Sequence, residues 1–311
     1  MNINQSITGT ATIEALQAPI KNKDKDRNKA KSTGFGLDKI MLLLVVIYFA
    51  VPLLMTLFFA ITDGSQLSGA GFSNILNDVD FTGTLSLSLE LAVASTLLTV
   101  LVVTPTAYWV QLRLPRASVV MDILSLVPFA VPAIVMAFGL IEVYSTDNPL
   151  IDVLSLGIAP LLRNSFNIVD TPPLLICAYV IIALPFVYRP IDNNLRAINT
   201  RVLSEAASSL GTGWWRTFLT VILPNIWPGV TSAALLTFST AMGEFTLASL
   251  FGLYTFPIYL NVTTQNDAHK AAALTILSFF ITLVCVLGIA LLSRIRRAGG
   301  GTQRLDMVAI K

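Results

Sequence analysis

Three glutamates lie within or at the ends of long apolar stretches of this 311-residue chain: Glu90, Glu142 and Glu244. An ionised carboxylate in apolar surroundings is costly, about 2.5–3.5 kcal/mol for Asp on membrane-insertion scales, so each is a candidate for function. We expect Glu142 near the outer end of its stretch, in reach of water, and Glu90 early in its stretch, facing an aqueous pathway. Glu244 follows Met242 and Gly243. It is a candidate for gating, for a structural role, or for attracting a cationic or zwitterionic substrate.

Residue patterns typical of other chemistry are missing. The chain has one histidine, His269, and its two cysteines, Cys177 and Cys285, both lie in apolar runs. A metal site rich in histidine or thiolate and a disulfide framework are therefore not expected. The chain has no GxxxxGK followed by Ser or Thr, no HExxH and no GxSxG. We expect no bound ATP, no cofactor and no enzymatic activity on this chain.

The composition is that of a polytopic membrane protein, because 54% of the residues are hydrophobic, 12% are charged and the mean hydropathy is +0.74. The net charge is only +2 and the basic residues are scattered, so a nucleic-acid partner is not expected. Helices that cross about 30 Å of hydrocarbon need about 20 apolar residues. Six runs meet this length: 40–61, 85–110, 121–143, 172–188, 226–251 and 271–292. The predicted fold is an all-α membrane protein with six transmembrane helices surrounded by lipid.

The polar segments divide the chain into three parts. Residues 1–39 include "KNKDKDRNKAK" and lack an apolar period, which predicts a disordered basic tail. The six-helix domain spans 40–292, and a second tail spans 293–311. The run 40–61 is too long for the core of a signal peptide and is expected to remain as an anchor.

The distribution of basic residues predicts the orientation. Of the 20 Lys and Arg, all but Arg163 and Lys270 fall on one side of a six-span arrangement. The positive-inside rule makes that side cytoplasmic and places both termini inside. The loop between the fourth and fifth runs is then cytoplasmic too.

That fourth loop is predicted to contain a short helix. "TRVLSEAASSL", from Thr200 to Leu210, has good helix formers and no proline. Gly211 stands where a left-handed cap would end the helix, and Thr212 is placed to cap the next one. A helix of about ten residues is marginal by itself in water. Something must brace it.

Two surfaces could supply the bracing. The membrane could hold the side marked by Trp214, Trp215 and Phe218. A protein partner could approach the other side closely, because the segment Glu205 to Ser209 has small residues after the glutamate.

The same loop resembles a known signature. Glu205, Ala206 and Ala207, then Gly211, then Leu223 and Pro224 are similar to the EAA motif of the MetI-like inner-membrane permeases of binding-protein-dependent ABC importers. Val221 stands where that family usually has isoleucine. The resemblance covers about residues 85–292 and includes "TPTAYWVQLRLPR", Pro128, Pro132 and "MGEFTLASLFG".

The resemblance implies a mechanical role in a bacterial inner membrane. In that family the short helix is a coupling helix seated in a groove of an ATPase subunit. Glu205, Ala206, Ala207 and Gly211 inherit that role, with Leu223 and Pro224 completing the loop. The implied partners are ATP-binding cassette ATPases, a second permease that is identical or homologous, and an extracytoplasmic solute-binding protein. "GEF" at Gly243 to Phe245 most resembles the branch that imports polyamines, thiamine, ferric iron or phosphonates.

Two alternatives stay open at this level. The loop helix could simply lie on the headgroups, anchored by Trp214 and Trp215. The chain could also be an ion-coupled secondary transporter that uses Glu90 and Glu244, which predicts inverted repeats and matching interrupted helices. Neither repeat nor interruption is visible in the sequence. The resemblance also argues against substrate binding at Glu244, because family members that carry anions have Gly and Glu at this point.

Overall fold

The computed structural model describes residues 37–63, 66–67, 72, 75, 78–145, 153, 158 and 171–308, with only the backbone path from 292 onward. The chain divides into two units, Met1–Leu54 and Met55–Lys311. Most of the tail expected at residues 1–39, the loop with Arg163, and residues 309–311 lie outside the described residues.

The first described helix, α3 (Leu37–Ile61), is apolar around its whole circumference. Its side chains from Ile40 to Phe49 are exposed in the isolated chain. A helix that is hydrophobic on all sides suits lipid rather than water. A two-residue antiparallel ladder follows it, in which β1 (Thr62–Asp63) pairs with β2 (Gln66–Leu67).

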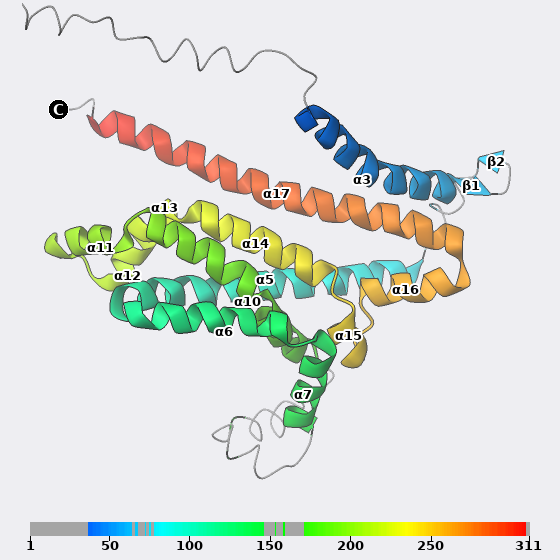
Figure 1. Cartoon of the computed structure of the whole chain (residues 1–311), viewed down its shortest axis with the longest axis horizontal. Helices are drawn as coiled ribbons and strands as arrows, with labels where there is room; N and C mark the ends of the chain where they lie inside the picture. The colour runs from blue at the N-terminus through cyan, green and yellow to red at the C-terminus, as the bar shows by residue number, and fades with distance from the viewer. Residues whose placement is uncertain are drawn as a thin grey trace, which may run out of the picture. The chain divides into compact units, whose positions relative to one another are not determined.

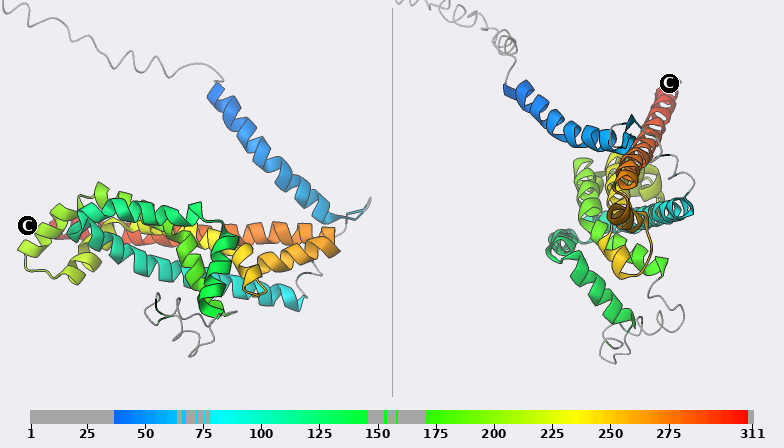
Figure 2. Two further views of the ribbon diagram at one scale, coloured as in Figure 1. Left: turned by 60° about the horizontal axis from the view of Figure 1, so that its bottom comes forward. Right: turned by 90° about the vertical axis from the view of Figure 1, so that its right-hand side faces the viewer.

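Three helices form the centre of the second unit: α5 (Val79–Arg113), α10 (Pro172–Ala197) and α14 (Trp227–Met242). They lie side by side in the views of Figures 1 and 2 and pack on one another. Many of the buried positions between them carry small side chains, which let helix backbones approach closely in a membrane. These positions include Ala92, Ala107, Ala178, Ala183, Ala233 and Ala241.

The expected third span, 121–143, is not one straight helix. It consists of α6 (Ser118–Ala130) and α7 (Ala133–Ser145), preceded by the 3-10 turn η2 (Pro115–Ala117), and the two arms meet at 99°. Pro132 has no N–H to continue the ladder and disfavours helical geometry at the residue before it. Val131 is accordingly extended, with φ −100° and ψ 119°.

The expected fifth span, 226–251, is also interrupted. α14 ends at Met242, and a separate short helix, α15 (Thr246–Leu250), begins after Gly243 and Glu244. Two further helices follow, α16 (Phe256–Asn266) and α17 (Ala268–Val308). The sixth run, 271–292, lies within α17, and the helical path continues through most of the segment expected as a C-terminal tail.

Four described helices are long and apolar enough to cross a bilayer: α3, α5, α10 and α17. Two bent pairs pass the same test, α6 with α7 and the segment Trp214–Asn225 with α14, the latter bent by 76°. The described residues therefore contain six candidate spans if each bent pair counts as one. The all-α membrane fold is confirmed.

A polar cluster joins the beginnings of α5 and α17 to α16. Asp78 caps α5 through the backbone N–H of Asp80, accepts a hydrogen bond from Tyr259 Oη at 2.7 Å, and pairs with Lys270 Nζ at 2.5 Å. The Lys270 ammonium and the Tyr259 hydroxyl lower the pKa of Asp78 to about 2. The carboxylate therefore stays charged, which keeps the three helix ends tied together.

Candidate functional site

The fourth loop contains the predicted helix, α11 (Thr200–Ser209). It begins after Asn199, a left-handed residue with φ 49°, and ends before Gly211, with φ 79°. At its end the N–H of Gly211 donates to Ser208 O at 2.9 Å and the N–H of Thr212 donates to Ala207 O at 3.2 Å. This pair of bonds is a Schellman motif. The helix and its glycine turn are confirmed.

The structure corrects the expected role of Thr212. Its hydroxyl donates back to the carbonyl of Ala207, at the end of α11, and accepts a hydrogen bond from the Thr217 hydroxyl at 3.2 Å. The next helix, α12 (Trp214–Thr217), is preceded instead by Gly213 and has no side-chain cap. Thr212 therefore closes the first helix and does not cap the second.

One face of α11 is buried in the protein and the opposite face is exposed. Ala207 is buried, with 8% of its surface exposed. Val202, Ala206 and Leu210 occur at every fourth position and are exposed, with Leu210 at 85% and Val202 at 64%. Glu205 is exposed as well, and its carboxylate pairs with Arg201 Nε at 2.9 Å. An apolar stripe thus runs along the outer face of a polar loop, which we call the α11 stripe (Val202, Ala206 and Leu210).

The tryptophans behave differently from each other. Trp214 packs into the protein, stacked on the rings of Tyr108 and Phe218 at centroid distances of 5.3 and 5.9 Å. Phe218 is 5% exposed, whereas Trp215 is 62% exposed. Lipid was expected to brace all three side chains, but two of them are braced by α5. Only Trp215 is placed to reach a surface.

The loop returns to the core through an unusual turn. α12 continues into η3 (Phe218–Ile222), a π-helical turn, and then into α13 (Leu223–Asn225). Pro224 is exposed and cannot donate to the ladder, while Leu223 packs against the buried cluster around Ile222. π-Helical turns often mark functional segments. The turn lies directly beside the two motif residues.

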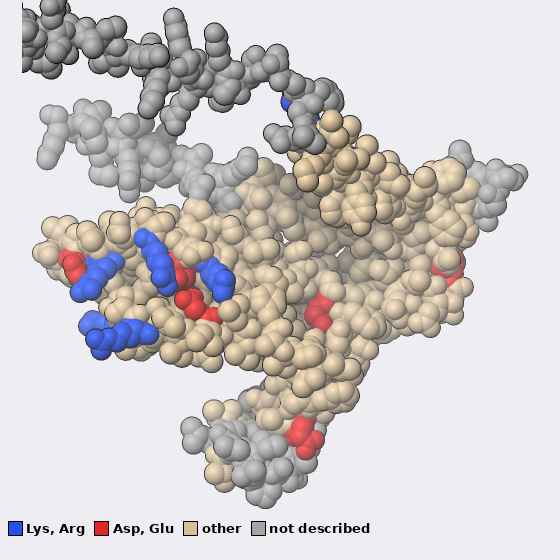
Figure 3. Space-filling model, viewed as in Figure 1, with Lys and Arg blue, Asp and Glu red and all other residues tan. Residues whose placement is uncertain are grey.

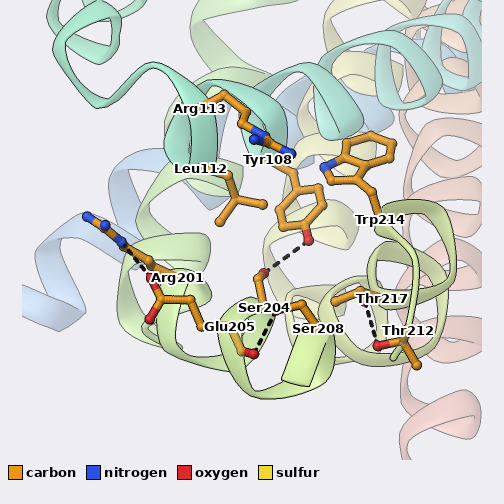
Figure 4. A pocket seen from close by; sticks show the side chains of 10 residues that line it. All are labelled: Tyr108, Leu112, Arg113, Arg201, Ser204, Glu205, Ser208, Thr212, Trp214 and Thr217. Atoms are coloured by element: carbon orange, nitrogen blue, oxygen red, sulfur yellow. Dashed lines mark hydrogen bonds and ion pairs between the residues drawn. The ribbon is translucent and has the colours of Figure 1, made fainter. Parts of the chain in front are cut away.

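A cavity of about 340 Å³ opens between α11 and the end of α5. Figure 4 shows Leu112 and Arg113 of α5 on one side, with Arg201, Glu205 and Ser208 of α11 on the other. α11 is therefore not packed along its whole length against α5.

A buried carboxylate holds the neighbouring helix ends together. Asp192 of α10 is 3% exposed. It accepts hydrogen bonds from Gln111 Nε2 at 2.9 Å and from Arg196 Nε at 2.7 Å. Arg196 also lies 3.8 Å from the carboxylate of Asp122 on α6. The network thereby connects α5, α6 and α10 near the loop, and no sequence pattern indicated it.

Basic side chains gather at the same end of the second unit. The exposed arginines there are Arg113, Arg116, Arg189, Arg196, Arg201 and Arg216. Figure 3 shows blue side chains together where Figure 1 places α11 and α12.

Comparison with known proteins identifies this arrangement. Residues 104–298 match the family model of the binding-protein-dependent transport system inner membrane component. The chain belongs to this family. It is a multi-pass permease, and the family predicted from the sequence is confirmed.

Named relatives carry different solutes. The permease is 35% identical over 169 residues to the molybdenum transport system permease protein ModB of Azotobacter vinelandii, covering 53% of this chain and 70% of ModB. It is 31% identical over 167 residues to the spermidine/putrescine permease PotB of Escherichia coli, covering 53% and 59%. It is 29% identical over 183 residues to the sulfate permease CysW of Synechococcus elongatus, covering 58% and 60%. The matched segments of PotB and CysW are thus under two thirds of those proteins.

A solved structure shares the fold. The crystal structure of a bacterial ABC transporter involved in the import of the acidic polysaccharide alginate aligns with a TM-score of 0.64 and 17% identity. The alignment covers 88% of the permease and 97% of that chain.

The three candidate glutamates are not brought together. Glu90 is exposed on α5 and Glu142 is exposed on α7. Glu244 lies at the break between α14 and α15, where its carboxylate accepts from the backbone N–H groups of Leu247 at 2.9 Å and Ala248 at 3.2 Å. These donors have no partner within a helix. The side chain of Glu244 thus completes the start of α15.

We expect Glu244→Ala to destabilise the permease by about 0.5–2 kcal/mol, the usual cost of losing a side-chain cap. Glu244→Gln keeps one oxygen that can accept from Leu247 and should retain most of the stability and uptake. Thermal unfolding of the purified permease and uptake in vesicles would compare the variants. If the glutamine variant folds normally but imports as poorly as the alanine variant, the charge itself is needed and a gating or substrate role follows.

Sequence reasoning missed several residues of this site. Asn199 could have been suspected, since asparagine is the residue other than glycine that most often adopts a left-handed conformation after a helix. Tyr108 lies within "TPTAYWVQLRLPR", but nothing in that segment indicates that its ring meets Trp214. Such a contact depends on how α5 and the loop are packed.

Proposed function

We propose that this permease forms half of the translocation pathway of an ABC importer and that α11 is its coupling helix. The observation that supports this best is the α11 stripe. An apolar stripe with a four-residue repeat, on a helix of a polar loop, is what a groove on a partner protein binds. The partner protein that supplies this groove would be an ATP-binding cassette ATPase.

The loop is suited to transmit a movement. Left-handed residues stand at both ends of α11, Asn199 and Gly211. Thr200 Oγ1 also donates to the carbonyl of Leu195, which ties the start of α11 to α10. If α11 moves as one unit, the segments joined to its two ends, including α10, must move with it. Ala207, buried in the permease, would fasten α11 from inside, while Glu205 and Ala206 face the partner.

The charge pattern supports a cytoplasmic position for the loop. Exposed arginines gather at the end of the permease that contains α11 (Figure 3), and basic residues mark the cytoplasmic side of a membrane protein. Both termini would then be cytoplasmic as well. The ion-coupled alternative is not favoured, because the family match and the named relatives are permeases of binding-protein-dependent systems.

The remaining partners would be a second permease and an extracytoplasmic solute-binding protein. The solute would be small and charged, and molybdate, sulfate and spermidine are the first to test. Glu90 is exposed on α5 and could line the pathway or face the second permease. Glu244 would serve structure or gating, because its oxygens already accept backbone hydrogen bonds.

A pair of matched cysteine variants tests the docking face. Leu210→Cys and Leu219→Cys replace leucines that are 85% and 54% exposed at the same end of the permease. In a background without Cys177 and Cys285, a benzophenone maleimide on residue 210 should cross-link an ATPase that contains GxxxxGK[ST]. The same probe on residue 219, in the π-helical turn, should not. Cross-linking from residue 219 alone would contradict the assignment of α11.

A further inference from the structure

Tyr108 connects α5 to both sides of the Gly211 turn. Its ring is fully buried, with 0% exposed, and its hydroxyl lies 3.0 Å from Ser204 Oγ on α11. After the turn, the same ring stacks on Trp214 and on Phe218, each at a centroid distance of 5.3 Å. One side chain of α5 thus contacts the helix before the turn and the helix after it.

The cavity leaves the contact between Tyr108 and Ser204 as a principal link between α5 and α11. Figure 4 shows the Tyr108 hydroxyl reaching across to Ser204, while Leu112 and Arg113, one turn further along α5, line the open space beside α11. α11 can therefore change its tilt without clashing with the last turn of α5. Any such tilt moves Ser204 and changes the hydrogen bond between Ser204 and the Tyr108 hydroxyl.

The end of α5 near Tyr108 contains a residue that allows the helix to bend. Pro105 lies inside the helix, three residues before Tyr108, and removes one backbone hydrogen bond. Such positions are the usual sites of bending in membrane helices. The other end of α5 is fixed by Asp78, which is bonded to Lys270 and Tyr259. A force at Tyr108 would bend α5 at Pro105 while its beginning stays anchored.

We propose that Tyr108 is the positioning residue through which α11 controls α5. This rests on the proposed coupling role of α11 and adds the element that receives the movement. ATPase binding needs the outer face of α11, whereas transmission needs Tyr108 on the inner side. Loss of the Tyr108 hydroxyl therefore leaves the ATPase bound but weakens the link between hydrolysis and uptake.

The test uses Tyr108→Phe, which keeps the ring stack and removes the hydroxyl, together with Ser204→Ala and the double variant. Tyr188→Phe is the matched control, because Tyr188 is 1% exposed in the same buried cluster and its hydroxyl has no hydrogen-bond partner among the described residues. Each variant is reconstituted in vesicles with the ATPase and the binding protein. Labelled molybdate, sulfate and spermidine serve as transport probes, and ATP hydrolysis is measured in parallel.

Tyr108→Phe and Ser204→Ala should each lower the solute imported per ATP by about three- to tenfold, the effect of one ordinary hydrogen bond on an equilibrium. The KM for ATP and the amount of co-purified ATPase should not change. The double variant should be no worse than either single one, since both remove the same bond. Tyr188→Phe should import normally.

Failure of the two proposals would look different. If the ATPase does not cross-link at residue 210, the coupling role of α11 fails. If it cross-links there and Tyr108→Phe couples as well as Tyr188→Phe, or if the effects of Tyr108→Phe and Ser204→Ala add, the inference about Tyr108 is wrong while the coupling role stands.

Discussion

Gly211→Val is expected to uncouple ATP hydrolysis from uptake while the permease still inserts and folds. Gly211 has φ 79°, and a Cβ built there would meet no atom of the described residues within 4 Å. The effect is therefore one of backbone conformation and not of crowding. A β-branched residue at this φ costs on the order of 1–2 kcal/mol or more. Relief of that strain would break the bonds from Gly211 and Thr212 to the end of α11 and would tilt the α11 stripe.

A neighbouring glycine supplies the control. Gly213 lies two residues further on, has φ −74°, and a Cβ there would also have no neighbour within 4 Å in the part of the chain that the structure describes. Gly213→Val should bind the ATPase and import normally. Gly211→Asn should fall between the wild type and Gly211→Val, because asparagine tolerates the left-handed region. Co-purification of the ATPase and uptake per ATP would measure all three. Normal coupling in Gly211→Val would contradict the proposed role of the turn.

The second large effect is expected at Gly229, where the start of α14 crosses α10. A Cβ at this position would lie 2.8 Å from Asn194 Cγ and 2.8 Å from the backbone carbonyl of Pro190. Asn194 could rotate away, but its amide donates to that same carbonyl at 2.8 Å, and the carbonyl cannot move without the helix. Gly229→Ala should therefore push α14 from α10 and destabilise the permease by about 1–3 kcal/mol.

Yield and thermal unfolding in detergent would measure the loss at Gly229. Gly288→Ala is the control, because Gly288 lies inside α17 and a Cβ there would meet no described atom within 4 Å. That change should be neutral or slightly stabilising, since alanine is the better helix former. Asn194→Ala combined with Gly229→Ala should recover little, because the clash with the carbonyl of Pro190 persists. Full recovery would show that the asparagine alone restricts the site.

Much of the membrane architecture follows directly from the sequence. The positions of the spans can be predicted from the lengths of the apolar runs, because a helix needs about 20 apolar residues to cross the hydrocarbon core. Gly211 after a helix-forming segment gives the end of α11, because few other residues adopt a left-handed conformation at low cost. The EAA-like spacing led to the family that the comparison then confirmed.

The interrupted spans were beyond the reach of a hydropathy pattern. Runs 121–143 and 226–251 remain apolar through Pro132 and Gly243, so their length indicates a single crossing. Both residues also occur in continuous membrane helices, where neighbouring groups satisfy the freed backbone. Whether such a helix bends depends on its neighbours. At Glu244 the break is stabilised by the start of α15, because the carboxylate accepts hydrogen bonds from the N–H groups of Leu247 and Ala248.

The direction of each side chain was decided only by the tertiary structure. The sequence alone predicted a permease with apolar runs of spanning length and with a short helix and glycine turn between the fourth and fifth runs. It could not show that Ala207 and Trp214 face inward while Ala206 and Leu210 face outward. In a soluble helix the buried face is usually the apolar one, but α11 has apolar residues on both faces, because Ala207 is buried while Ala206 and Leu210 are exposed. The faces of these helices are therefore set by shape and packing, and Tyr108 became visible as the contact of α11 only when α5 and the loop were placed together.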